Sequence, residues 1–318
     1  MDLTSMETPD YSKPFIIYRC PGDGKFTTCT DVSTTGNSIC SGDITVTTWL
    51  NRPLAKMEVE ERSTSYADYC RVVAQTIDNA RKRNGKTVIV RSICGTFSRF
   101  APLEMAAKYF AMFPEMFCFM FYHPDTGYWM GASPELLVEI IGNKAFTRAL
   151  AGTRTACSDS EWDSKNKAEH DLVIEDITAN IGLLGRHWSV AKGETGIFRY
   201  SGIEHLCTPI TIEHSNQNIP IHSLIEALHP TAAVGGFPRK DALADIASLE
   251  SRPRKFYAGI FSTGSFAYVL LRCVHFDTRR WCVYTGSGVT GFSVPDDEWN
   301  ETKAKAYPLL SILNQYSI

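Results

Sequence analysis

The sequence lacks the features that mark several large classes of protein. None of its ten cysteines forms a C-x₂-C pair, which excludes the usual spacing of zinc and dithiol sites. Its most apolar segment, residues 116–122, is far shorter than the roughly 20 residues that span a bilayer. The net charge is only −3, so neither nucleic acid nor a membrane surface is an expected partner.

The sequence also lacks a secretory signal and the common catalytic motifs. Residues 1–10 contain neither a basic nor an apolar stretch, so we expect a cytoplasmic protein whose cysteines are free thiols. There is no P-loop, no G-x-S-x-G and no H-E-x-x-H. These absences exclude the familiar signatures of nucleotide, hydrolase and zinc-protease sites.

What is present is the composition of a globular protein, with 44% hydrophobic and 21% charged residues. No Pro/Ser-rich linker or long charge run divides the chain, so we expect a single domain over residues 1–318. Strands joined by short turns predict a mostly antiparallel α+β fold, and residues 21–62 carry little signal. The expected helices are 65–84, 102–113, 163–184, 221–228, 239–250 and one from 295. The expected strands are 15–20, 87–91, 116–122, 128–131, 136–141, 145–150, 257–261, 266–273 and 281–285.

The C-terminal segment is the most informative part of the chain. A glycine-rich stretch, expected to be a turn, follows an apolar strand and precedes an acidic helix. Glu298, Glu301 and Lys305 have the spacing i, i+3, i+7 and share one helical face. Glycine amides bind anions, and carboxylates bind a hard cation such as Mg²⁺. The segment therefore suits a small polyanionic substrate bridged by a metal, or else an amphipathic surface helix.

Five other segments could carry chemistry, and each has a structural alternative. Lys86 opens an apolar strand and is either a desolvated general base or a solvated strand-end charge. Glu135 follows Ser-Pro and is either a general acid or an exposed turn residue. Residues 149–154 are expected to form a turn of small residues, which either lets a ligand approach the backbone or is a tight turn with only a structural role. Glu169 is a metal ligand or a solvated helix charge, and residues 228–239 line an anion site or simply connect two elements.

The order and spacing of these segments resemble the chorismate-utilising enzymes. The matching blocks are KTVIVR, GASPE, ALAGTR, KNKAEHDLV, LHPTAAVGGFPR, FYAG, LLR and GSGVTG–EWNETKAK. The resemblance implies an α+β fold of two large, mainly antiparallel sheets stacked with helices outside. It also implies that Mg²⁺ holds the ring carboxylate of the substrate chorismate. We expect the protein to be a monomer or a weak homodimer.

Three features resemble the isochorismate synthase branch of this family. Lys86 stands where anthranilate synthases usually carry glutamine, and Ala151 stands where aminodeoxychorismate synthases carry a lysine. The HPTAAVGGFPR segment is similar to that of isochorismate synthases. The alternatives are a salicylate synthase, which also eliminates pyruvate, and an inactive relative that serves as a binding or regulatory subunit. The resemblance fits menaquinone, siderophore and salicylate biosynthesis equally.

The resemblance also implies a role for each site residue. Lys86 is the base for water attack at C2 of the ring, and Glu135 is the acid that protonates the departing C4 hydroxyl. Glu169 and Glu301 bind Mg²⁺, with Glu298 as a nearby second carboxylate. The implied substrate-binding residues are Gly152, Thr153, His229, Tyr257, Arg272, Gly286, Gly288 and Lys305.

Within this set, Arg272 and the amides of Gly286 and Gly288 resemble a clamp for the enolpyruvyl carboxylate. The chain departs from the family pattern at Arg148, at Ser287, where alanine is usual, and in a shorter region before Lys86.

Overall fold

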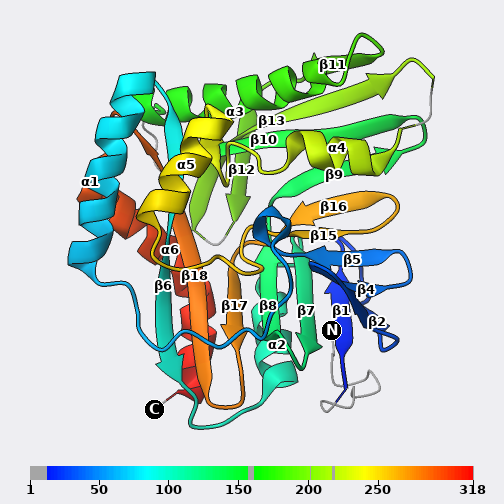
Figure 1. The fold of residues 1–318 in the computed structure, drawn as a ribbon, viewed down its shortest axis with the longest axis vertical. Helices are drawn as coiled ribbons and strands as arrows, with labels where there is room; N and C mark the ends of the chain where they lie inside the picture. Colours follow the sequence, from blue (N-terminus) through cyan, green and yellow to red (C-terminus); the bar gives the residue numbers. More distant parts are fainter. Residues whose placement is uncertain (1–12, 157–160, 201, 217–218, 318) are drawn as a thin grey trace.

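The computed structural model describes residues 13–156, 161–200, 202–216 and 219–317. In this part of the chain the strands form two sheets in which every pair is antiparallel (Figure 1). The eight-stranded sheet has the order β14 (Gly236–Phe237), β6 (Lys86–Thr96), β18 (Arg280–Thr290), β17 (Cys273–Phe276), β8 (Gly127–Ser133), β7 (Phe117–His123), β1 (Phe15–Arg19) and β2 (Thr27–Cys29). The ten-stranded sheet has the order β11 (Trp188–Lys192), β13 (Ile203–His214), β10 (Lys144–Thr155), β9 (Leu136–Ile141), β16 (Phe266–Val269), β15 (Ile260–Ser262), β5 (Ile44–Thr47), β4 (Ser38–Ser41) and β3 (Ser33–Thr35), and β12 (Gly196–Tyr200) also pairs with β13. The predicted α+β architecture of two large, mainly antiparallel sheets is confirmed.

Helices cover the outside of both sheets, as predicted (Figure 1). The eight-stranded sheet carries α1 (Tyr66–Arg83), α2 (Pro102–Ala111) and α6 (Pro295–Leu313). The ten-stranded sheet carries α3 (Ser164–Leu183) and α4 (Ile221–Leu228), while α5 (Arg239–Leu249) packs on β6 and β14. Two short 3₁₀ helices are η2 (Trp49–Asn51) and η3 (Asn314–Tyr316). No helix in the described ranges is both long enough and apolar enough to cross a membrane.

Apolar side chains from the inner faces of both sheets form the main core. Phe117, Phe119 and Trp129 of the eight-stranded sheet lie in one buried cluster with Phe261 of the ten-stranded sheet. A second cluster packs α2 and α6 against the opposite face of the eight-stranded sheet. Nine cysteines in the described residues are free, and Cys157 lies outside them.

Helix α1 begins and ends where its sequence predicts. The side chain of Ser65 accepts a hydrogen bond from the backbone N–H of Asp68 at 3.1 Å, which satisfies a free amide of the first turn. Asn84 adopts the left-handed conformation at the C-terminal cap, with φ of 49°, and so ends the helix just before Gly85.

Two predicted strands are placed wrongly around the link between the sheets. The predicted strand 266–273 covers β16 and only the first residue of β17, and these two strands belong to different sheets. The chain passes between them at Leu271 and Arg272, and a φ of 51° at Arg272 breaks the extended conformation. The predicted strand 257–261 begins only at Ile260, because Ala258 has a φ of 61°.

Two predicted glycine turns lie inside long strands. Gly286 and Gly288 belong to β18, opposite Val90 and Val88 of β6. The segment 149–154 belongs to β10, where the register shifts between Ala151 and Thr153. Gly152 forms this bulge with a φ of 72°, which a residue with a Cβ adopts only with strain.

Several strands had no sequence prediction. Residues 21–62 contain β2 to β5, and residues 188–214 contain β11, β12 and β13. The N-terminal strands are three or four residues long with mixed burial, so their alternation of polar and apolar residues is too short to detect.

Strand β6 lies at the edge of its sheet beyond the two residues that pair with β14. Its outward amides nevertheless have acceptors. Val90 donates to Glu250 Oε1 at 3.0 Å, Ser92 donates to Thr64 Oγ1 at 3.1 Å, and Cys94 donates to the Ser63 hydroxyl at 2.9 Å. Side chains therefore replace a neighbouring strand along this edge.

A polar network fixes α1 and α5 against β6, and its removal should destabilise the fold. Asp245 Oδ2 lies 2.6 Å from Arg83 Nη2, and Asp245 also accepts from Asn79 and Thr87 at 2.8 and 3.0 Å. Asp245→Ala leaves Arg83 without its counter-ion, so the free energy of unfolding in urea should fall by about 3 kcal/mol. The control Asp78→Ala, on the exposed face of α1, should change it by less than about 0.5 kcal/mol. Equal unfolding midpoints for the two variants would contradict this role.

Candidate active site

A cavity of about 70 Å³ lies between the two sheets, next to the first turns of α3. Nine of the predicted site residues line it, although they come from strands, helices and loops far apart in the sequence. They are Lys86, Gly152, Thr153, Glu169, Tyr257, Arg272, Gly286, Gly288 and Lys305. Four other predicted residues, Glu135, His229, Glu298 and Glu301, do not line this cavity.

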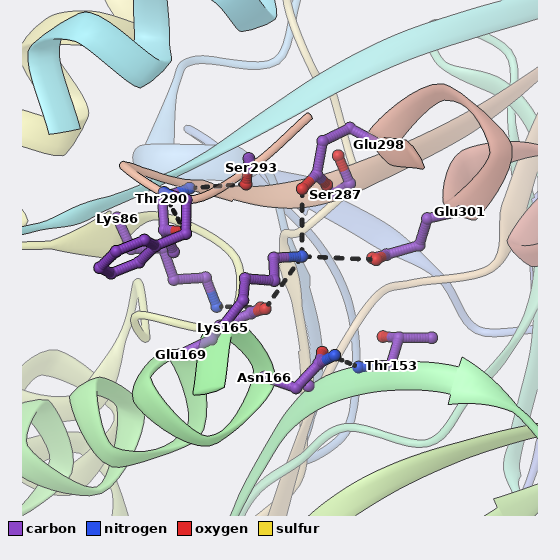
Figure 2. Close-up of polar contacts among 12 residues, drawn as sticks. Lys86, Thr153, Lys165, Asn166, Glu169, Ser287, Thr290, Ser293, Glu298 and Glu301 are labelled. Carbon is purple, nitrogen blue, oxygen red and sulfur yellow. Dashed lines mark hydrogen bonds and ion pairs between the residues drawn. The ribbon is translucent and has the colours of Figure 1, made fainter. Parts of the chain in front are cut away.

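Lys86 and Glu169 form a buried ion pair at the cavity wall (Figure 2). Lys86 Nζ lies 2.9 Å from Glu169 Oε1, and the lysine side chain is 1% exposed. This burial excludes the alternative of a solvated strand-end charge. Burial also tends to raise the pKa of Glu169, but Lys86 and Lys165 outweigh it and hold that pKa well below its usual range.

The absence of a side chain at Gly288 gives this ion pair its space. A Cβ at that position would lie 2.4 Å from Glu169 Oε1 and 2.5 Å from Lys86 Cε. The neighbouring Ser287 directs its hydroxyl to Tyr69 Oη of α1 at 2.8 Å. The glycines of this segment therefore allow close approach within a strand, and they do not form a turn.

Three carboxylates from α3 and α6 surround the ammonium of Lys165 (Figure 2). Lys165 Nζ lies 3.0 Å from Glu298, 3.7 Å from Glu169 and 4.0 Å from Glu301. Burial lowers the pKa of Lys165, but the three carboxylates outweigh it and raise that pKa. Burial, followed by the charge of Glu301, raises the pKa of Glu298.

These carboxylates have the chemistry of a site for a hard cation. Carboxylate oxygens are the ligands that Mg²⁺ prefers, and the buried Glu298 Oε2 has no hydrogen-bond partner in the described structure. The same residues do not form a closed metal cage, because no group of three or more His, Cys, Asp or Glu in the described ranges is arranged to hold an ion. The donor set fits the metal, while a lysine ammonium lies among the donors.

Two cations lie at another side of the cavity. Arg272, at the link between the sheets, donates from Nη1 to the Lys305 carbonyl oxygen at 3.2 Å. Lys305 in turn contacts Glu301 at 2.6 Å and the Gly286 carbonyl oxygen at 3.2 Å. Arginine and lysine side chains held in this way can bind a substrate carboxylate.

Glu135 is a buried carboxyl group just beyond β8, which excludes the alternative of an exposed turn residue. Burial raises its pKa to about 7, although Arg148, Lys86, Lys305 and Arg272 oppose the shift. A carboxyl group with this pKa is partly protonated near neutral pH and can donate a proton.

His229 lies away from the cavity, against Trp49, with ring centroids 5.6 Å apart. Burial lowers its pKa to about 3, so the imidazole is neutral. The cavity is lined by Ala233 and Val234 of the same loop.

Sequence reasoning missed three residues of the site. His205 of β13 lines the cavity, and its Nδ1 lies 2.9 Å from the Gly152 carbonyl oxygen. A carbonyl only accepts, so Nδ1 carries the proton and Nε2 is the acceptor. Asn166 accepts from the Thr153 amide at 2.9 Å. Lys165 and Asn166 stand i−4 and i−3 from Glu169, a helical spacing that could have identified them, whereas His205 lies in a segment with no strand signal.

Gly288→Ala tests the close approach of β18 to the ion pair. The added Cβ must displace Lys86 or Glu169, so the free energy of unfolding should fall by about 1–3 kcal/mol, as for other overpacked sites. Gly264→Ala is the control, since the nearest atom to its Cβ would be 3.6 Å away. Thermal and urea unfolding measure both variants, and an unchanged Gly288→Ala protein would refute the packing argument.

Comparisons with known proteins show the family to which this chain belongs. The chorismate binding enzyme family matches residues 43–314. The chain is 31% identical to "Putative isochorismate synthase MenF" of Mycobacterium tuberculosis, over 83% of this chain and 78% of that protein. It is 30% identical to isochorismate synthase MenF of Pasteurella multocida, over 78% of this chain and 62% of that protein.

Among solved structures, MenF, the menaquinone-specific isochorismate synthase from Escherichia coli, superposes with a TM-score of 0.71 at 25% identity. The match covers 82% of this chain and 64% of that one. With the family matched over most of its length, the chain belongs to the chorismate-binding enzymes.

Proposed function

We propose that the protein is an isochorismate synthase that converts chorismate to isochorismate, by water attack at C2 and loss of the C4 hydroxyl. The observation that carries the proposal is the burial of Lys86 at the cavity wall, where it can act on water. The nearby carboxyl of Glu135, with its raised pKa, supplies the acid that hydroxyl loss requires.

In this mechanism Lys86 accepts a proton from water as the water attacks the ring. In the structure Lys86 donates to Glu169, so it must first give up a proton before it can act as a base. Glu135 then protonates the departing hydroxyl. Arg272 and Lys305 bind substrate carboxylate, and Gly152, Thr153 and Tyr257 orient the ring.

Glu169, Glu298 and Glu301 are the residues that would hold Mg²⁺. When bound, Mg²⁺ supplies positive charge that neutralises the ring carboxylate of chorismate. A substrate clamp that includes the amides of Gly286 and Gly288, a role for His229, a single domain over residues 1–318, a cytoplasmic location and a monomeric or weakly dimeric state stay predictions.

The direct test is product analysis with the purified full chain, chorismate and Mg²⁺. Isochorismate as the only product supports the proposal. Salicylate with an equal amount of pyruvate would instead identify a salicylate synthase, and unchanged chorismate would point to an inactive binding subunit.

Glu135→Gln tests the general acid. Glu135 can donate only while it is protonated, so kcat/KM of the wild type should fall as the pH rises through about 7. Two substrate carboxylates nearby should raise the pKa further, which moves the corresponding fall in kcat to higher pH. Glu135→Gln should lower kcat by about 10²–10⁴ and abolish the fall in rate at high pH. The control Glu139→Gln, on β9, should leave both kcat and the pH profile unchanged. A wild-type rate and pH profile in Glu135→Gln would exclude Glu135 from the reaction.

Lys86→Ala tests the base. Isochorismate formation should fall by about 10²–10⁴ in kcat, with little change in KM because Arg272 and Lys305 remain. The matched control is Lys82→Ala, an exposed lysine of α1, which should behave as wild type in steady-state kinetics. Weaker chorismate binding with an unchanged chemical step would make Lys86 an electrostatic anchor instead.

A further inference from the structure

Three lysines face the three site carboxylates, and they differ in exposure and in the number of carboxylates within 4.0 Å. Lys86 is 1% exposed, with a 2.9 Å contact to Glu169. Lys305 is 16% exposed, with a 2.6 Å contact to Glu301 and a second contact to the Gly286 carbonyl oxygen. Lys165 is 20% exposed and lies within 4.0 Å of all three carboxylates, with its shortest contact at 3.0 Å to Glu298. Lys165 is therefore the cation that all three carboxylates share, and it is also the most exposed of the three.

The backbone that carries Lys165 is fixed, so its side chain is the part that can move. Asp163 caps α3 and accepts from the Asn166 amide at 2.7 Å. Asn166 also accepts from the Thr153 amide of β10 at 2.9 Å. These bonds hold the residues on both sides of Lys165, while 20% of the Lys165 side chain is exposed to solvent.

The ammonium of Lys165 and a divalent cation need the same oxygens. Lys165 reaches all three carboxylates between 3.0 and 4.0 Å, and like charges repel strongly at such a separation in a buried site. The two cations cannot both occupy the point where Glu169, Glu298 and Glu301 converge.

We propose that Lys165 is a tethered counter-ion that competes with the divalent metal for Glu298 and its neighbours, and that metal binding releases it toward solvent. The inference rests on the proposed metal role of these carboxylates. It makes Lys165 a positioning residue that keeps the carboxylates paired and the metal readily exchangeable, and it explains why they do not form a closed cage.

The first test measures metal affinity and not turnover. Full-length protein is treated with EDTA, dialysed and titrated with Mg²⁺ by calorimetry and with Mn²⁺ by electron paramagnetic resonance. Lys165→Met removes the charge and keeps most of the length of the side chain, so it should bind both ions at least about tenfold tighter, a change of about 1.4 kcal/mol. Lys167→Met, an exposed lysine of the same helix, should bind them as the wild type does. Equal or weaker binding by Lys165→Met overturns the proposal.

A second test uses the wild-type protein and does not depend on the variant folding. Reductive methylation followed by mass spectrometry reports how accessible each lysine amine is. Saturating Mg²⁺ should increase the labelling of Lys165 several-fold and leave that of Lys167 unchanged. Unchanged or reduced labelling of Lys165 overturns the proposal.

These outcomes are separate from the proposed activity. If the wild type binds metal and Lys165→Met binds it no more tightly, the counter-ion role is rejected and the proposed isochorismate synthesis is unaffected. If Lys165→Met binds metal more tightly but the wild-type protein forms no isochorismate, the proposed function is rejected and the counter-ion role stays intact.

Discussion

The burial of carboxylates between two layers of the fold is the constraint on which the rest of the structure depends. A buried carboxylate is costly unless a cation and hydrogen bonds compensate it. Glu169 comes from α3, which packs on the ten-stranded sheet, while Lys86 begins β6 of the eight-stranded sheet. Lys165 likewise links α3 to Glu298 of α6. The relative position of the two layers is therefore fixed by charge pairing at the site as well as by the aromatic core.

The sequence predicted the components of the site better than the paths of the chain through it. Glu298, Glu301 and Lys305 are spaced i, i+3 and i+7 and so lie on one face of a helix, which means that their proximity follows from local geometry. The glycines 286 and 288 were misread as a turn, because glycine suits both a turn and a close approach within a strand. Nothing local distinguishes these cases. The partner that requires the glycine, the Lys86–Glu169 pair, comes from elsewhere in the chain.

The misread strand at 266–273 has a similar cause. Its apolar residues suit a buried strand, but they are shared between two sheets and the break falls at Arg272. The short strands before residue 62 and the missed β13 depend on pairing with distant strands, as β5 does with β15. His205 could not be assigned because its role depends on the bulge at Gly152 in the neighbouring strand.

The covered edge of β6 also affects how the protein behaves in a crowded solution. An exposed strand edge recruits strands from other molecules and starts aggregation. The strand that carries Lys86 has outward amides already bonded to Glu250, Thr64 and Ser63. An incoming strand would have to break these bonds before it could form its own. The protein can thus keep the buried Lys86 at the start of an edge strand without making that strand a nucleus for fibre growth.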